Sequence, residues 1–208
     1  AARRENIRRL SSTHHTTTIP AIHMSHSLTS TSPNNDGTAL LVGKSSDFSE
    51  GRGRQIDVGN KRAVAIFRYR GTLFAIDHYC YHMGGPLAAS RDIEELSFTS
   101  NVGDKRTMAV SHACITCPWH KYTISLQTGE ALYRPVVARG RGKKWNQLSI
   151  NTTIQSKGVK QRTHQVWETN NHEVYLRINS STKLKYESDH YASQEFRDLM
   201  SRKSSETR

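Results

Sequence analysis

The chain of 208 residues has few large apolar residues and only three cysteines. Hydrophobic residues make up 35% of it and aromatic residues 8%, which suggests that part of the chain stays outside a folded core. No run approaches the roughly 18 apolar residues of a membrane-spanning helix, and no basic stretch precedes an apolar block as in a secretory signal peptide. An odd number of cysteines does not suit a disulfide framework, and their closeness to histidines indicates metal binding in a reducing compartment.

Acidic residues are also scarce. The chain has 18 of them against 30 lysines and arginines, a formal net charge of +12. A surface of this charge attracts phosphate, anionic lipid or an acidic protein partner. Part of the excess lies in the segment Arg139–Lys144 (RGRGKK). Because no aromatic residues are interleaved with it and no nucleic-acid recognition motif is present, we expect an acidic docking partner and no nucleic acid.

Residues 1–38 contain 13 Ser or Thr, four early arginines and only two acidic residues. So few apolar residues cannot offset the entropy cost of ordering, so we expect a disordered basic tail. The same composition is found in organelle transit peptides, which is the alternative. The expected location is cytoplasmic, or mitochondrial if this tail is a transit peptide. Because residue 1 is not Met, we take the chain to be a fragment or a processed product.

Short runs of β-forming residues separated by turn residues continue from residue 39 to residue 178, with almost no helical periodicity. Arg70-Gly71 lies between two such runs and indicates a hairpin turn. We therefore expect an all-β domain over residues 39–178, built as a small sandwich or barrel. Residues 179–208 form a polar tail with one possible short helix on the surface. The expected strands are Leu40–Gly43, Ala63–Tyr69, Thr72–Asp77, Thr107–Ile115, Tyr122–Leu126, Gln147–Thr153, Gln165–Glu168 and Glu173–Ile178.

Two short segments combine cysteine and histidine at metal-ligand spacing. One begins Cys80-Tyr81-His82 and continues with Met, Gly, Gly and Pro, and the other is Cys117-Pro118-Trp119-His120-Lys121-Tyr122. Thiolates and imidazoles bind iron and zinc, so either metal fits the residue types. The pair C-x-H and C-x-x-H, each with its glycine or proline context, resembles the signature of Rieske-type proteins. The resemblance covers roughly residues 39–178, and a Thr128-Gly129-Glu130 segment with Pro135 after it also matches.

The resemblance implies a [2Fe–2S] cluster, with Cys80 and Cys117 on one iron and His82 and His120 on the other. It also implies the Rieske fold, in which an antiparallel β base domain carries a small inserted cluster-binding subdomain, here about residues 77–135. Neutral imidazoles in place of two thiolates make reduction easier, and such centres span about −150 to +300 mV against about −400 mV for plant-type ferredoxins. Gly84 and Gly85 would let the backbone approach the cluster closely.

Two departures from the family pattern are visible. Respiratory Rieske proteins carry an extra cysteine in each segment, and the matching positions here are Gly85 and Trp119, so their disulfide cannot form. The serine that binds a bridging sulfide in high-potential members is replaced by Tyr122. Both departures resemble the soluble ferredoxins of lower potential. The spacing of 34 residues between His82 and Cys117 is also long, and we expect Ser97–Arg106 to be an inserted surface loop.

The resemblance implies a one-electron carrier between a reductase and an oxygenase-like acceptor, without a catalytic site of its own. The alternatives are an N-terminal fragment of a Rieske oxygenase and a zinc-binding structural or interaction module. Cys114 lies at zinc-like spacing from Cys117, yet we expect it to be a buried strand cysteine. We expect His78 to face solvent and His164 to be a structural or surface histidine. The redox partners and the oligomeric state do not follow from the sequence.

Overall fold

The computed structural model describes residues 38–59, 62–100, 108–138, 148–150, 153–193, 195–196, 198–200 and 202. The basic tail up to residue 37 and the segment 139–144 lie outside the described residues. The elements are β1 (Leu40–Lys44), η1 (Ser45–Asp47), β2 (Gly53–Val58), β3 (Arg62–Tyr69), β4 (Thr72–Asp77), η2 (Leu87–Ala89), β5 (Ile93–Ser100), β6 (Met108–Thr116), β7 (Thr123–Ser125), β8 (Glu130–Tyr133), β9 (Val136–Ala138), β10 (Leu148–Ile150), β11 (Ile154–Val159), β12 (Thr163–Glu168), β13 (Glu173–Arg177) and η3 (Glu187–Ala192).

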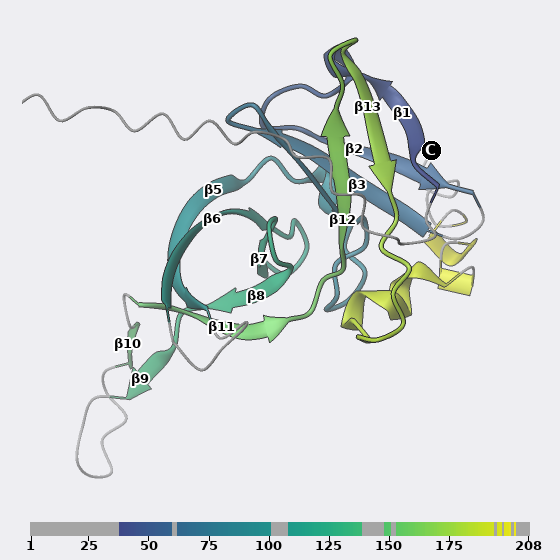
Figure 1. Ribbon diagram of the computed structural model, residues 1–208. Helices are drawn as coiled ribbons and strands as arrows, with labels where there is room; N and C mark the ends of the chain where they lie inside the picture. Colours follow the sequence, from purple (N-terminus) through teal and green to yellow (C-terminus); the bar gives the residue numbers. More distant parts are fainter. Residues whose placement is uncertain are drawn as a thin grey trace, which may run out of the picture. The chain divides into compact units, whose positions relative to one another are not determined.

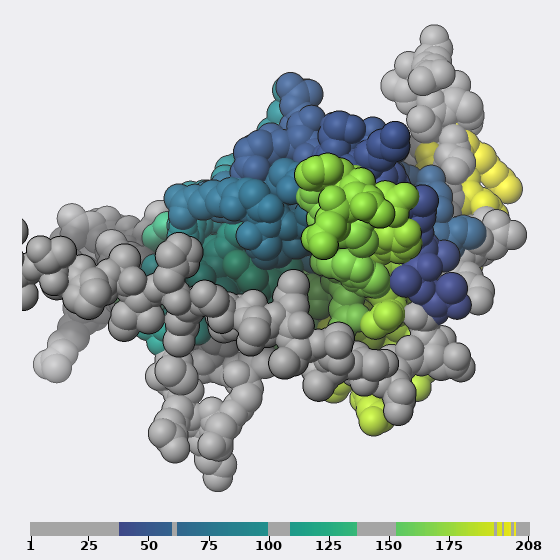
Figure 2. All heavy atoms as spheres, turned by 45° about the horizontal axis from the view of Figure 1, so that its top comes forward, coloured from purple at the N-terminus to yellow at the C-terminus, as the bar shows by residue number. Residues whose placement is uncertain are grey.

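Six strands form the base sheet in the order β1-β13-β12-β4-β3-β2, and every pairing between them is antiparallel. The predicted hairpin between β3 and β4 is confirmed, with Tyr69 opposite Thr72. Arg70 and Gly71 have φ values of 50° and 76°, the positive angles that a two-residue type I′ turn requires. The first and last strands of the domain thus belong to one sheet. Figure 2 shows them from outside, with light green residues of the late strands among blue and purple ones of the early strands.

Strand β3 is buried on both faces, which explains its almost unbroken apolar sequence. Val64 and Ile66 pack in one cluster with Val174 and Leu176 of β13. The alternate residues of β3 pack in a second cluster, together with residues of both Cys/His segments. Because side chains alternate along a strand, one face of β3 packs inside the base domain and the other face packs against the candidate site.

Strands β5, β6, β7, β8 and β11 close into a small barrel, inserted in the chain between β4 and β12 of the base sheet (Figure 1). This base sheet with an inserted smaller β unit is the predicted fold class. One pairing departs from the antiparallel rule, because β11 runs parallel to β5. The expected surface loop Ser97–Arg106 is wrong in its first part, because Ser97 to Ser100 continue β5 and pair with β6.

The chain after β13 was expected to be a polar tail with one possible short helix on the surface. It forms η3, and residues 195–196, 198–200 and 202 are helical. The Phe196 ring packs edge-on against Tyr79 and Tyr191, with ring centroids 5.2 and 4.9 Å apart. Tyr79 directly precedes the first cysteine of the candidate site, so this segment is part of the site's surroundings. No helix in the described part of the chain has the length and hydropathy of a membrane span.

Candidate metal centre

The two Cys/His segments are loops with the same backbone closure. In the first loop (residues 78–86), the N–H of Cys80 donates to the carbonyl of Gly85, and the N–H of Gly84 donates back to the carbonyl of Cys80. In the second loop (residues 117–122), the N–H of Cys117 donates to Tyr122 and the N–H of Lys121 donates to Cys117. Each loop thus curls around its own cysteine and presents its histidine at the turn.

The cysteines lie at the buried side of both loops. Cys80 and Cys117 are each 1% exposed, and they pack in the same core cluster. The Cys80 contact lowers the pKa of Cys117 to about 6, and the backbone N–H groups of Trp119 and His120 act in the same direction. The same thiol contact, together with burial, raises the pKa of Cys80. The pair therefore favours one thiolate, the form of cysteine that binds metals.

The histidines lie at the outer side of the loops. The rings of His82 and His120 are edge-on with centroids 5.0 Å apart, and His120 is exposed while His82 is half-buried. The Nδ1 atom of His82 is buried and has no hydrogen-bond partner. A buried ring nitrogen without a partner is costly unless it binds something, and a metal ion satisfies it. The Tyr122 ring lies 4.1 Å from the His82 ring and covers one of its faces.

Gly85 and Trp119 bring the two loops into contact. A Cβ atom on Gly85 would lie 2.8 Å from the sulfur of Cys117 and 3.2 Å from the ring of Trp119. The first distance is too short for any side chain, so only glycine lets the loops approach this closely. The contact of the Trp119 ring with Gly85 thus joins the two loops.

A buried charged group lies behind the start of the first loop. Asp77, at the end of β4, accepts hydrogen bonds from Arg62 at 2.5 Å and from His164 at 3.1 Å. Burial opposes its ionisation, but the contacts with His164 and Arg62 outweigh burial and hold the pKa of Asp77 below its usual value. Asp189 of η3 binds both Arg62 and Arg162.

Sequence reasoning missed this group. A signal was present, because Arg62 and Asp77 bear opposite charges at the open ends of one apolar hairpin. Opposite charges at these two ends predict an ion pair between Arg62 and Asp77 at the open end of the hairpin. The predicted structural role of His164 is confirmed, since it is buried and its Nδ1 atom accepts the N–H of Asn179.

Two further predictions can be compared with the structure. Cys114 is fully buried in β6 and packs with Phe98, Leu132 and Ile154 in a core cluster that contains neither Cys80 nor Cys117, so the predicted core role is confirmed. Burial raises the pKa of its thiol to about 12. The prediction that His78 faces solvent is wrong: it is 4% exposed, and burial lowers its pKa to about 4. His78 follows a buried strand whose direction it continues.

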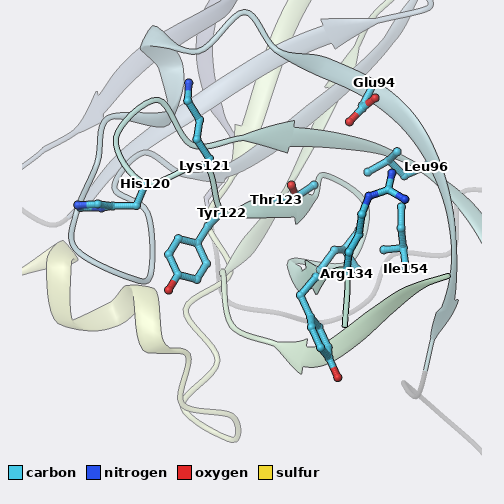
Figure 3. A pocket seen from close by; sticks show the side chains of 10 residues that line it. Glu94, Leu96, His120, Lys121, Tyr122, Thr123, Arg134 and Ile154 are labelled. Carbon is cyan, nitrogen blue, oxygen red and sulfur yellow. The ribbon is translucent and has the colours of Figure 1, made fainter. Parts of the chain in front are cut away.

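A cavity of about 360 Å³ opens beside the second loop (Figure 3). His120, Lys121 and Tyr122 line it on one side. Residues of the barrel strands, among them Glu94, and Arg134 directly after β8 line the other. Its walls carry both charges, so a polar group of a partner would find hydrogen-bonding atoms in it. The cavity therefore lies between His120 and residues of strands β5, β7, β8 and β11.

Comparison with known proteins gives relatives for most of the described chain. The sequence pattern of a family described as soluble Rieske-type ferredoxin matches residues 40–181. A human Rieske domain-containing protein is 34% identical over 164 residues, which cover 79% of this chain and 89% of that protein. Among solved structures, the chain is similar to the ferredoxin of carbazole 1,9a-dioxygenase from Nocardioides aromaticivorans IC177, with 16% identity, a TM-score of 0.40 and coverage of 67% of this chain and 96% of that one. It is also similar to a Sphingomonas yanoikuyae B1 ferredoxin, with 16% identity, a TM-score of 0.40 and coverage of 68% and 99%.

Proposed function

The chain belongs to the family of soluble Rieske-type ferredoxins, and we propose that it carries single electrons on a [2Fe–2S] cluster bound by Cys80, His82, Cys117 and His120. The cluster supplies the redox chemistry, since it takes up and releases one electron. Cys80 and Cys117 would bind one iron, and His82 and His120 would bind the other.

The observation that carries this proposal is the segregation of the two donor types. The cysteines are paired in the interior, and the histidines are paired toward the surface, with a buried and unpartnered nitrogen on His82. A binuclear cluster takes two protein ligands per iron, which suits two separate pairs. A zinc ion needs four donors around one point. Among the described residues, no three His, Cys, Asp or Glu side chains converge on a single ion site.

The chain's own residues define where an electron would leave. His120 is exposed, whereas both cysteines are buried beneath the loops. An electron would therefore pass through an imidazole edge to a partner that docks on the loop tips. No substrate pocket is needed for this task, which fits a carrier rather than a catalyst.

The loop tips also have the composition of a docking surface. Met83 and Trp119 are exposed by 54% and 48%, and they stand beside the two histidines in sequence. Exposed apolar and aromatic residues of this kind are enriched in protein interfaces. Lys121 and the cavity beside His120 add a positive charge and a polar recess. We propose that a reductase and an oxygenase-like acceptor dock here with acidic surfaces, and that this docking weakens as salt rises.

Metal and sulfide analysis of the purified protein tests the proposed function. We expect a red-brown protein with two irons and two acid-labile sulfides per chain, and an EPR signal of low average g value after reduction. A colourless protein with one zinc would contradict the cluster and favour the structural module. An N-terminal oxygenase fragment would hold the same two irons, because the mononuclear iron of such enzymes lies in a separate catalytic domain. The length of the full gene product distinguishes that fragment from a carrier.

The proposed location follows the sequence expectation: cytoplasmic, or mitochondrial if the basic N-terminal tail is a transit peptide. An import assay with isolated mitochondria distinguishes the two. Protease-protected, shortened chain would indicate the mitochondrion, whereas chain that stays outside and keeps its length would indicate the cytoplasm.

A further inference from the structure

We propose that Gln161 and Tyr191 are positioning residues that clamp the first loop from two sides and thereby fix the orientation of His82. This inference rests on the proposed function, because it assigns these residues a role toward the same centre. Neither residue belongs to the Cys/His motifs, and they lie 80 and 109 residues after Tyr81 and His82, which they contact. Together they hydrogen bond to the backbone of Asp77 and Tyr79 before the first candidate ligand, of Tyr81 between the two, and of His82 itself.

Gln161 holds the first loop from the inside. Its side chain is fully buried, and its Nε2 atom donates to the carbonyls of Asp77 and Tyr79, both at 2.9 Å. Its Oε1 atom accepts the N–H of Tyr81 at 2.8 Å. One carboxamide therefore satisfies three backbone groups on both sides of Cys80. Because each buried backbone group must find a partner, these bonds specify one path for the loop.

Gly129 fixes Gln161 in turn. The backbone N–H of Gln161 donates to the carbonyl of Gly129 at 3.0 Å. Gly129 has a φ of 74°, and a Cβ atom there would lie 1.9 Å from the carbonyl oxygen of Gln161. Only glycine permits both this angle and this approach. The Thr128-Gly129-Glu130 segment thus fixes the position of the Gln161 backbone.

Tyr191 holds the first loop from the outside. Its hydroxyl donates to the carbonyl of His82 at 2.7 Å. Phe196 packs against Tyr191, and a Cβ atom on Gly84 would lie 2.2 Å from the Phe196 ring. Tyr191 and Phe196 of the segment after β13 therefore contact the turn of the first loop directly, at His82 and Gly84. Ser188 anchors this segment beneath, because its hydroxyl donates to Asp77 at 2.6 Å and accepts the N–H of Arg162 at 2.9 Å.

The two loops differ in how the strands around them fix their ends. The second loop closes a hairpin, since β6 and β7 pair directly on either side of it, up to Thr116 opposite Thr123. The ends of the first loop meet in one isolated bridge between Tyr79 and Pro86, between β4 and η2. A single bridge fixes orientation less firmly than a strand pair. The clamp supplies the constraint that a hairpin supplies to the second loop.

Two substitutions test the clamp, each with a matched control. Gln161→Met keeps the length of the side chain and removes its hydrogen bonds, with Gln165→Met on the exposed side of β12 as control. Tyr191→Phe removes one hydroxyl and keeps the ring, with Tyr175→Phe as control, whose hydroxyl bonds Glu173. Three readouts apply: amide hydrogen exchange of Tyr81, loss of visible absorbance in the presence of an iron chelator, and the g values of the reduced protein by EPR.

For Gln161→Met we expect at least tenfold faster exchange at Tyr81, at least tenfold faster cluster loss and altered g values, because three buried hydrogen bonds disappear. For Tyr191→Phe, which removes one bond, we expect about threefold faster cluster loss. The controls should match the unsubstituted chain. Altered g values separate a positioning role from a loss of stability alone, since g values report how the ligands are oriented around the iron.

The clamp is wrong if Tyr191→Phe and Gln161→Met match their controls in all three readouts. Should Gln161→Met fail to fold, Tyr191→Phe decides the question, because the tyrosine ring and its contact with Phe196 remain. The amide exchange of Tyr81 is measurable whether or not a cluster is present. If the unsubstituted chain is colourless and Gln161→Met exchanges faster at Tyr81, the proposed function is wrong and the clamp is supported. If the chain is red and the variants leave exchange, cluster loss and g values unchanged, the proposed function is supported and the clamp is wrong.

Discussion

Gly84 and Lys121 occupy equivalent positions in two loops of different sequence. Each donates its backbone N–H to the carbonyl of the cysteine four positions earlier, and their φ values are 71° and 59°. Glycine adopts this left-handed conformation without cost, whereas a lysine loses roughly 1–2 kcal/mol in it. The two loops thus share this hydrogen bond and this backbone conformation, but only the first loop has a glycine at the left-handed position.

Substitutions at these two positions should therefore have opposite effects on stability. Lys121→Gly should raise the free energy of unfolding by up to about 1 kcal/mol, because the relief of the left-handed conformation exceeds the added flexibility of the unfolded chain. Gly84→Ala should lower it by about 2 kcal/mol or more, since it combines an unfavourable φ with the overlap on Phe196. Urea unfolding followed by tryptophan fluorescence measures both. Loss of stability in both variants would contradict the equivalence.

The three cysteines should separate into two groups. Cys80→Ser and Cys117→Ser should lose most of the iron and sulfide, because a hydroxyl is a poor ligand in place of a thiolate. Cys114→Ser should keep both near the unsubstituted level and only lower stability, since Cys114 is packed in the barrel core. Iron and acid-labile sulfide are measured per chain after purification. Equal loss of iron and sulfide in all three variants would indicate that Cys114 is also a ligand and does more than fill the barrel core.

The reduction potential should lie in the lower part of the range for such centres. The residues that raise it in respiratory relatives are absent here, because Tyr122 replaces the serine and Gly85 and Trp119 replace the disulfide cysteines. We expect about −150 mV at neutral pH, the lower limit of Rieske centres. Protein-film voltammetry measures it. A potential above about +200 mV, high in the same range, would show that these replacements do not set it.

Low pH should weaken the ion pairs that Asp189 forms with Arg62 and Arg162 behind the first loop. Burial opposes the ionisation of Asp189, but its bonds with Arg162 and Arg62 lower the pKa to about 2. An aspartate with a pKa near 3.9 in the unfolded chain then contributes stability above about pH 4, and this contribution, about 2 kcal/mol, is lost as the pH falls through about 2.

Asp189→Asn should therefore lower the free energy of unfolding by about 2 kcal/mol or more at neutral pH, and should flatten its dependence on pH between about 4 and 2. Asp92→Asn, at an exposed aspartate, is the matched control. Urea unfolding at a series of pH values measures both effects. A variant that keeps the unsubstituted pH dependence would show that the ion pairs of Asp189 do not link stability to pH.

The sequence by itself predicted the family, the all-β class and the hairpin at Arg70-Gly71, because each of these depends on a local signal. The cysteine, histidine, glycine and proline residues of the two loops are close in sequence, and the positive φ values of a two-residue turn are a local demand. The strands with strong alternation or unbroken apolar runs, such as Ala63–Tyr69, were also predictable. Strand β2 was not, because Gly53–Val58 has only two large apolar residues and lies at the sheet edge.

Only the tertiary structure decided what surrounds the first loop. Gln161 and Tyr191 lie about 80 and 109 residues away from their partners in the chain, and their side chains are ordinary ones with no motif around them. The burial of His78 has the same origin, since packing against neighbouring elements, and not the local sequence, sets its exposure. Motifs reveal groups that chemistry demands at fixed spacing, whereas contacts between distant segments arise from how the sheet and the barrel bring them together.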